Sequence, residues 1–220
     1  METIKGRNPL LKIFIVLIII QLIRMIIEQI LFLFVDKTSL NADITAMITM
    51  SMLTALIVFI AHKQSIKLSV IPNAHNKKSI IGYICITIFV AFLIVSAPFF
   101  GGDFSLNVII PIVFSTIVTP IFEELIFRGY VWNELKSHFQ SEFRVYIIST
   151  IFFALWHLGY MDTIWFKMSL RGEITGFQFT MLMKVVIGLC FGIIIGLVRY
   201  KTKNCYAAIL MHSIMNVFGR

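Results

Sequence analysis

Long apolar stretches separated by short polar segments dominate the pattern of this chain. Most of them reach the length of about 20 residues that an α-helix needs to cross a bilayer. The pattern predicts about seven spans: Leu10–Val35, Ala42–Ala61, Ile80–Phe100, Leu106–Tyr130, Tyr146–Tyr160, Phe177–Val198 and Cys205–Phe218. The fifth and seventh are short, so we expect their ends to lie in protein or in a wet cavity. The expected fold is an all-α, polytopic bundle of transmembrane helices.

The composition supports a membrane protein. Of the 220 residues, 59% are hydrophobic and 14% are charged, whereas a soluble domain is about half apolar and about a quarter charged. Lipid must therefore be the solvent for much of the surface. The chain contains no internal repeat and no appended soluble segment. We expect one membrane domain over 1–220, in a multi-pass protein of the cell membrane.

The basic residues recur in alternate connections. They precede the first span and follow the second, fourth and sixth: Lys5, Arg7, Lys12, Lys63, Lys67, Lys77, Lys78, Lys136, Arg144, Arg199, Lys201 and Lys203. The fifth connection is mixed and should hold Asp162, Lys167, Arg171 and Glu173. By the positive-inside rule the amino terminus is cytoplasmic and the carboxyl terminus outside. Because the net charge of +8 forms no continuous basic face, we expect no nucleic-acid partner.

Two patterns of small or rigid residues bear on helix packing. Gly188, Gly192 and Gly196 recur every four residues in the sixth span. Such a ridge lets another helix approach closely and predicts a packing face. Pro111 and Pro120 lie in the fourth span and should bend or loosen that helix before its acidic pair.

The same span carries three charges close together, Glu123, Glu124 and Arg128. Glu124 and Arg128 are four residues apart, in the order that favours an ion pair on one helical face. Glu123 points about 100° away and has no such partner in its helix. We therefore expect one carboxylate to be held by the arginine while the other stays reactive. The alternative is an ordinary charged helix end at the membrane interface.

Two later spans contribute further polar residues. His157 follows Trp156 at the end of the fifth span, and His212 and Asn216 share one face of the seventh. Each has an ordinary interpretation, an interfacial histidine or a hydrogen-bonded pair between helices. Together with Glu123, however, three separate helices carry proton-transfer or ligand chemistry at membrane depth, where ionisable groups are costly and are functional candidates.

Other ionisable residues inside the spans do not join this group. Arg24 and Glu28 are four residues apart in the first span and should neutralise each other. Lys184 in the sixth span is expected either to pair with an acid or to extend its ammonium to the membrane surface.

The combination of Glu-Glu-x-x-x-Arg, Phe-x-x-x-His and His-x-x-x-Asn, each on its own helix, resembles the CPBP intramembrane proteases. This group is also known as the CAAX prenyl protease 2, Rce1-like or ABI family. The resemblance covers 106–220, which would be the catalytic core. The three spans in 1–105 carry no matching motif. A helical membrane enzyme that cleaves peptides near the cytoplasmic face is therefore implied.

The resemblance also implies a role for each residue. Glu123 would activate water as general base, with support from Glu124 and Arg128. His157 would orient or bind that water, while His212 and Asn216 would stabilise the oxyanion. If a metal is used, Glu123, His157 and His212 would be its ligands and zinc the expected ion. Because a metal-free mechanism uses the same residues, we expect no tightly bound metal.

Two other functions are compatible with these residues. The chain could be a non-catalytic membrane regulator, such as a bacteriocin self-immunity protein that keeps the motifs. A transporter with a carboxylate proton relay is less well supported, since its inverted repeats and broken helices in matching halves are not seen. For the enzyme, the expected partners are the lipid bilayer and a membrane-associated peptide or protein substrate.

Overall fold

The computed structural model describes residues 8–70 and 77–219, and every regular element in these ranges is helical. The longer α-helices are α1 (Pro9–Leu31), α2 (Ser39–Lys63), α3 (Lys77–Gly101), α7 (Glu142–Trp156), α8 (Met161–Arg171), α9 (Phe177–Thr202) and α10 (Cys205–Phe218). One continuous stretch comprises α4 (Leu106–Val113), the π-helix η1 (Phe114–Val118), α5 (Thr119–Glu124), the π-helix η2 (Leu125–Val131) and α6 (Trp132–His138). Two short 3₁₀-helices, η3 (His157–Tyr160) and η4 (Ile174–Gly176), precede α8 and α9. The predicted all-α class is confirmed.

Six helical stretches within the described ranges are long and apolar enough to cross a membrane, and α10 is a seventh, shorter apolar helix. This agrees with the predicted number of spans. The outer surface is correspondingly apolar, as on α3, where Phe92, Val95 and Phe100 are exposed. Soluble monomers rarely expose an apolar surface of this extent. The chain is a multi-pass membrane protein.

The fifth span is longer than predicted. Helix continues from Glu142 to Arg171, through Asp162 and Lys167, which were expected in a connection. That expectation is wrong because both charges have ion-pair partners on other helices. Asp162 lies 2.6 Å from Arg24, and Lys167 lies 2.5 Å from Asp43. Paired in this way, the charges do not force the helix to end.

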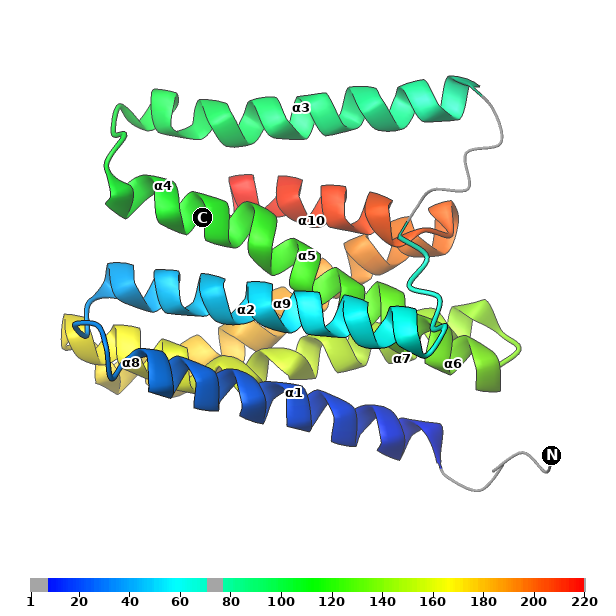
Figure 1. Ribbon diagram of the computed structural model, residues 1–220, viewed down its shortest axis with the longest axis horizontal. Coiled ribbons are helices and arrows are strands. Elements are labelled where there is room, and N and C mark those ends of the chain that lie inside the picture. The colour runs from blue at the N-terminus through cyan, green and yellow to red at the C-terminus, as the bar shows by residue number, and fades with distance from the viewer. Residues whose placement is uncertain (1–7, 71–76, 220) are drawn as a thin grey trace.

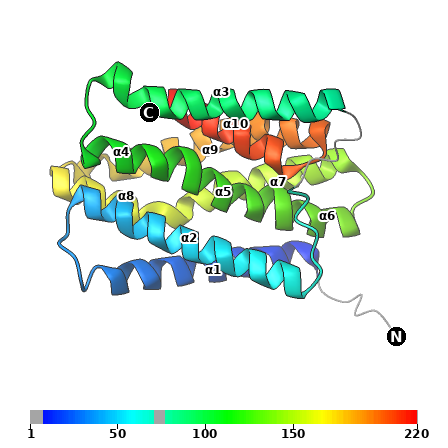
Figure 2. The ribbon, with the colours of Figure 1, turned by 45° about the horizontal axis from the view of Figure 1, so that its top comes forward.

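The helices form one bundle in which α1 lies beside α2 at one edge and α3 lies beside α10 at the other (Figures 1 and 2). Between these edges α7 packs closely against α9. A Cβ atom at Gly192 would lie 3.2 Å from the Phe153 ring, and one at Gly196 would lie 2.8 Å from the Tyr146 ring. The glycine ridge is therefore a packing face, as predicted.

The fourth span is loosened around Pro120. In η1 the Thr119 N–H bonds to the Phe114 carbonyl, five residues back, instead of the Ser115 carbonyl. Pro120 has no N–H with which to replace that bond. The Ser115 carbonyl is consequently left free for a partner outside its own helix, about two turns before Glu123.

Most basic residues at the helix ends of the described ranges lie at one end of the bundle, whereas Lys37 and Arg171 lie at the other. The basic end holds the start of α1, the end of α2, the connection between α6 and α7, and the connection between α9 and α10, with Lys12, Lys63, Lys67, Lys136, Arg144, Lys201 and Lys203. Lys5, Arg7 and the side chains of Lys77 and Lys78 lie outside the described residues. The opposite end, at the left of Figure 1, carries the connections α1–α2, α3–α4 and α8–α9.

Candidate functional site

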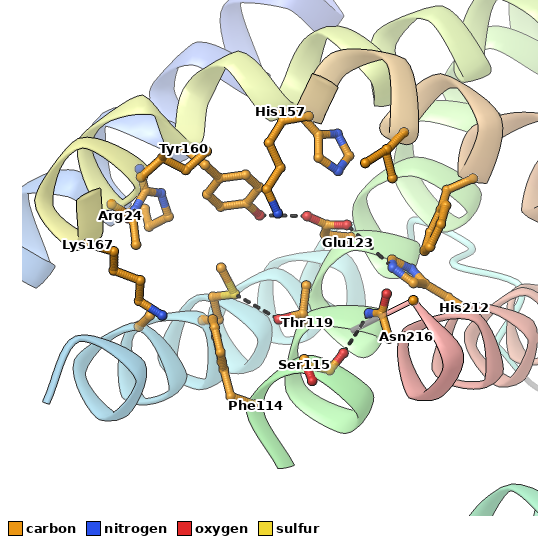
Figure 3. Close-up of a pocket in the computed structure, with 18 of the residues that line it drawn as sticks. Arg24, Phe114, Ser115, Thr119, Glu123, His157, Tyr160, Lys167, His212 and Asn216 are labelled. Carbon is orange, nitrogen blue, oxygen red and sulfur yellow. Dashed lines mark hydrogen bonds and ion pairs between the residues drawn. The ribbon is translucent and has the colours of Figure 1, made fainter. Parts of the chain in front are cut away.

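A cavity of about 410 Å³ lies inside the bundle. Figure 3 shows its polar side chains converging from several helices. Its lining includes Arg24, Glu28, Phe114, Ser115, Thr119, Glu123, His157, Tyr160, Lys167, Lys184, Phe191, His212 and Asn216. The cavity thus gathers residues from both halves of the chain. Of the six predicted site residues, Glu123, His157, His212 and Asn216 line it, whereas Glu124 and Arg128 lie behind the wall.

Glu123 enters the cavity from α5 and is only 2% exposed. Its Oε1 atom accepts a hydrogen bond of 2.7 Å from the Tyr160 hydroxyl and a longer one of 3.3 Å from Trp156 Nε1. Its Oε2 atom accepts no hydrogen bond from the described residues, and its nearest ionic neighbour is His212 Nε2 at 3.9 Å. One carboxylate oxygen is therefore held in place while the other is available to a ligand.

Glu124 is fully buried and faces the other way. Arg128 approaches it side-on, with Nη1 donating to Oε1 at 3.2 Å and Nε 3.2 Å from Oε2. Arg128 is also fully buried, donates from Nη2 to the Gly192 carbonyl and lies 4.3 Å from the centre of the Phe153 ring. The structure thus contains the ion pair that the four-residue spacing predicts. Buried charges of this kind need such pairing.

His212 connects the two glutamates. Its Nδ1 atom lies 2.9 Å from Glu124 Oε1. Because Glu124 is ion-paired with Arg128, its carboxylate accepts the bond and Nδ1 carries the proton. The opposite ring atom, Nε2, is then directed toward Glu123 and the cavity. The ring itself is fixed edge-on between Phe153 and Phe191.

His157 is held in an analogous way at the start of η3. Its Nδ1 atom lies 2.8 Å from the Phe153 carbonyl. A carbonyl can only accept, so Nδ1 again carries the proton and Nε2 is left as an acceptor in the neutral ring. The ring packs on Gly188 so closely that a Cβ there would lie 2.6 Å from Nδ1. The first glycine of the ridge therefore makes room for a site residue.

Asn216 enters the cavity from the last turns of α10. Its Nδ2 atom donates a hydrogen bond of 2.6 Å to the Ser115 carbonyl, the group that η1 and Pro120 leave free. Figure 3 shows this bond beside Glu123 and His212. The amide nitrogen has two hydrogens. One is used to join α10 to the fourth span, and the second is available to a ligand.

Sequence reasoning did not identify Tyr160 or Trp156 as contacts of Glu123. The two are four residues apart, so they share a helical face, and both combine an aromatic ring with a hydrogen-bond donor. Trp156 Nε1 also lies 3.0 Å from the Tyr160 hydroxyl. The four-residue spacing of Trp156 and Tyr160, on either side of His157, was the feature of the sequence from which these contacts could have been predicted.

A buried ionic network supports Tyr160 from α1. The Arg24 guanidinium lies 5.1 Å from the centre of the Tyr160 ring. It pairs with Glu28 at 2.9 Å, as the sequence predicted, and with Asp162 at 2.6 Å, which it did not. It also donates to the Gly159 carbonyl. The first span therefore fixes the η3–α8 junction that carries Tyr160.

A zinc site is not formed by these residues as placed. Glu123, His157 and His212 were its expected ligands, but no group of three such side chains in the described ranges is close enough to share a metal ion. Both histidines do present Nε2 to the cavity with Nδ1 hydrogen-bonded, as metal ligands commonly do. The side chains would nevertheless have to move to coordinate an ion together.

The arrangement has the parts required for hydrolysis by an activated water. It offers a carboxylate oxygen without a protein donor, imidazole acceptors on His157 and His212, and a free amide hydrogen on Asn216. The cavity walls are otherwise largely apolar, and exclusion of bulk water strengthens such polar interactions.

Residues 105–218 match the family described as type II CAAX prenyl endopeptidase, Rce1-like. This match covers just over half of the 220 residues, and it includes every predicted site residue. The chain belongs to this family of membrane proteases. A region of 59 residues is 39% identical to a protein named CAAX prenyl protease 2 from Methanococcus maripaludis. The aligned region is 26% of this chain and 21% of that protein, so the chain spans about a fifth of the length of the relative it matches. No solved structure is significantly similar to the chain.

Proposed function

We propose that this protein is an intramembrane endopeptidase that hydrolyses a peptide bond in a membrane-associated peptide or protein. The observation that carries the proposal is the environment of Glu123, one oxygen held by Tyr160 and the other unbonded in the cavity beside His212. Membership of a CAAX protease family supports the same activity. The core of the enzyme would be 106–220, with α1 supplying support through Arg24.

In the proposed reaction Glu123 Oε2 takes a proton from a water molecule as the water oxygen attacks the peptide carbonyl. His157 Nε2 accepts the second hydrogen of that water and orients its lone pair. A C–O bond forms and negative charge develops on the carbonyl oxygen. When the C–N bond breaks, protonated Glu123 returns its proton to the leaving amine, and the carboxylate is restored.

The developing oxyanion would be stabilised by His212 and Asn216. The free hydrogen on Asn216 Nδ2 can donate directly. His212 can donate from Nε2 only as an imidazolium, because its Nδ1 proton is engaged with Glu124. The Glu124 carboxylate, which is ion-paired with Arg128, lies 2.9 Å from Nδ1 and would stabilise that cation. In this account the Glu124–Arg128 pair acts through His212 rather than on the substrate.

The most direct test of the activity uses the purified full chain with a panel of apolar, fluorescence-quenched peptides. Wild type should cleave at least one of them, and Glu123→Ala should not, while both elute as folded protein. The sequence also left open a non-catalytic regulator such as a bacteriocin self-immunity protein. That alternative predicts that Glu123→Ala retains the biological effect at equal expression.

The cavity also bears on which membrane face receives the substrate. Its lining lies in the half of the bundle opposite the basic end, toward the end of α1, the end of α8 and the end of α10, as Glu28, Lys167 and Gly219 show. The predicted cytoplasmic amino terminus and the predicted cleavage near the cytoplasmic face therefore correspond to opposite ends of the bundle. Because the positive-inside rule assigns the basic end to the cytoplasm, we propose that the cavity opens toward the extracytoplasmic face.

Labelling of single cysteines in whole cells tests this orientation. In a chain whose native cysteines are replaced by alanine, Asp103→Cys lies at the cavity end and Ser137→Cys at the basic end, and both positions are exposed. A membrane-impermeant maleimide should label Asp103→Cys in intact cells and Ser137→Cys only after permeabilisation. The reverse pattern would place the cavity opening on the cytoplasmic side.

A further inference from the structure

The cavity is lined by three cations, and two of them are neutralised. Arg24 pairs with Glu28 and Asp162, and Lys167 pairs with Asp43. The third cation is Lys184 on α9. It has no ion-pair or hydrogen-bond partner among the residues that the structure describes, and it is exposed.

Lys184 lies on the cavity face of its helix. Ile187 and Phe191, three and seven residues further along α9, line the same cavity. Residues with this spacing share one face of an α-helix. The Lys184 side chain therefore belongs to the wall of the proposed active site.

Along the wall of the cavity, Lys184 lies next to His157. Gly188, one turn after Lys184, is where the His157 ring packs. The Lys184 ammonium is close enough to His157 to interact with it electrostatically. A ligand bound at His157 and Glu123 would therefore have this ammonium beside it.

An unpaired ammonium within an apolar span is energetically costly, and charged groups at such positions usually have a partner or a ligand. The two acids that line the cavity do not supply a partner, since Glu28 is paired with Arg24 and Glu123 forms no ion pair with Lys184. A bound anion would neutralise the charge. A compact ammonium on a flexible stem suits a carboxylate, because it can donate in several directions.

We propose that Lys184 is a specificity-determining residue that binds a carboxylate of the peptide substrate, either an acidic side chain or the carboxyl terminus. The inference rests on the proposed function, since the ligand is the substrate of that site. One helical turn is about 5.4 Å, and an extended peptide advances about 3.3 Å per residue. The carboxylate would accordingly lie within a few residues of the scissile bond.

The test measures binding separately from cleavage. Four fluorescein-labelled apolar decapeptides share one sequence and carry either Glu or Gln near the middle, with either a free or an amidated carboxyl terminus. Their affinities are measured by fluorescence anisotropy with Glu123→Ala protein in phosphatidylcholine nanodiscs. We expect at least one carboxylate to tighten binding about tenfold or more. A difference between the Glu and Gln peptides identifies a side-chain carboxylate as the ligand, and a difference between the free and amidated peptides identifies the carboxyl terminus.

Adding Lys184→Met should abolish this preference, whereas Lys184→Arg should retain most of it. The matched control is Lys201→Met, an exposed lysine at the basic end of the same helix. Equal affinities for all four peptides, or a preference that survives Lys184→Met, would overturn the inference. The inference would also fail if Lys184→Met changed only the amount of phosphatidylglycerol that co-purifies with the protein from the cell membrane, since the ligand would then be a lipid phosphate.

Cleavage of the same four peptides is measured in parallel with the wild-type protein. A Lys184-dependent binding preference without cleavage of any peptide would contradict the proposed function while leaving the binding site established. Cleavage of the peptides without any preference for a carboxylate would support the proposed function and contradict the role of Lys184. The two claims therefore fail separately.

Discussion

His212 lies between the two adjacent glutamates, with Nδ1 2.9 Å from Glu124 Oε1 and Nε2 3.9 Å from Glu123 Oε2. The buried carboxylate that pairs with Arg128 thereby fixes which nitrogen of His212 carries a proton. The other nitrogen is directed at the oxygen proposed to activate water. Two neighbouring residues of one helix thus act on opposite sides of one imidazole ring.

This relationship predicts that His212→Asn lowers the turnover number about 10²–10³-fold, the loss seen when one oxyanion donor is removed from a protease. KM should change little, because the donor acts mainly on the transition state. The Glu124–Arg128 pair remains intact in this variant, so the protein should stay folded. Steady-state peptide cleavage measures both constants. His138→Asn, at the exposed end of α6, is the matched control and should behave as wild type.

Tyr160→Phe removes the shorter of the two hydrogen bonds to Glu123 Oε1. A hydrogen bond to a charged group contributes about 1.5–3 kcal/mol, so a misplaced Glu123 should reduce the turnover number at least about tenfold. Tyr146→Phe is the control, since that hydroxyl donates to the Ile193 carbonyl away from the cavity. If the two variants lose the same small amount of activity, the Tyr160 hydroxyl does not position Glu123 for catalysis.

Gly188→Ala tests the packing of His157. The added Cβ would lie 2.6 Å from His157 Nδ1, so the ring must move out of its position. Activity should fall strongly while the remaining α7–α9 contacts keep the bundle assembled. Gly82→Ala on α3, where a Cβ meets nothing within 4 Å, should leave activity unchanged. Full activity in Gly188→Ala would show that the position of His157 is unimportant.

The Arg24 network predicts a stability effect. Arg24→Met leaves Glu28 and Asp162 without their buried partner, and breaking a buried pair in this way costs about 3–5 kcal/mol. The apparent melting temperature in detergent should therefore fall by many degrees. Lys136→Met removes an exposed partner of Glu142, which retains Lys203. Exposed pairs contribute about 0–1 kcal/mol, so this control should melt close to wild type.

The sequence predicted the parts of this structure that depend on local spacing. The pairs Glu124–Arg128 and Arg24–Glu28 are each four residues apart on one helix, and the glycine ridge follows the same period. Span number followed from the length of the apolar stretches. These features need no knowledge of which helices meet.

Features that depend on which helices meet could not be predicted. Tyr160 reaches Glu123 across 37 positions, and Asp162 reaches Arg24 across 138. Without those contacts, the charges of α8 indicate a connection rather than a helix. The proposed direction in which the cavity opens likewise rests on the placement of its lining residues together. That proposal keeps the predicted cytoplasmic amino terminus and replaces the predicted cleavage near the cytoplasmic face.

The central claim is that Glu123 is the base and that its position does not depend on a bound metal. It is tested most directly by the rate of peptide cleavage by Glu123→Gln, compared with Glu134→Gln, a partly buried carboxylate outside the cavity that pairs with Lys12. We predict a loss of at least about 10³-fold for the first variant, none for the second, and no effect of a zinc chelator on wild type. Cleavage by Glu123→Gln at the wild-type rate would contradict the claim, and chelator-sensitive cleavage restored by zinc would show that a metal is required.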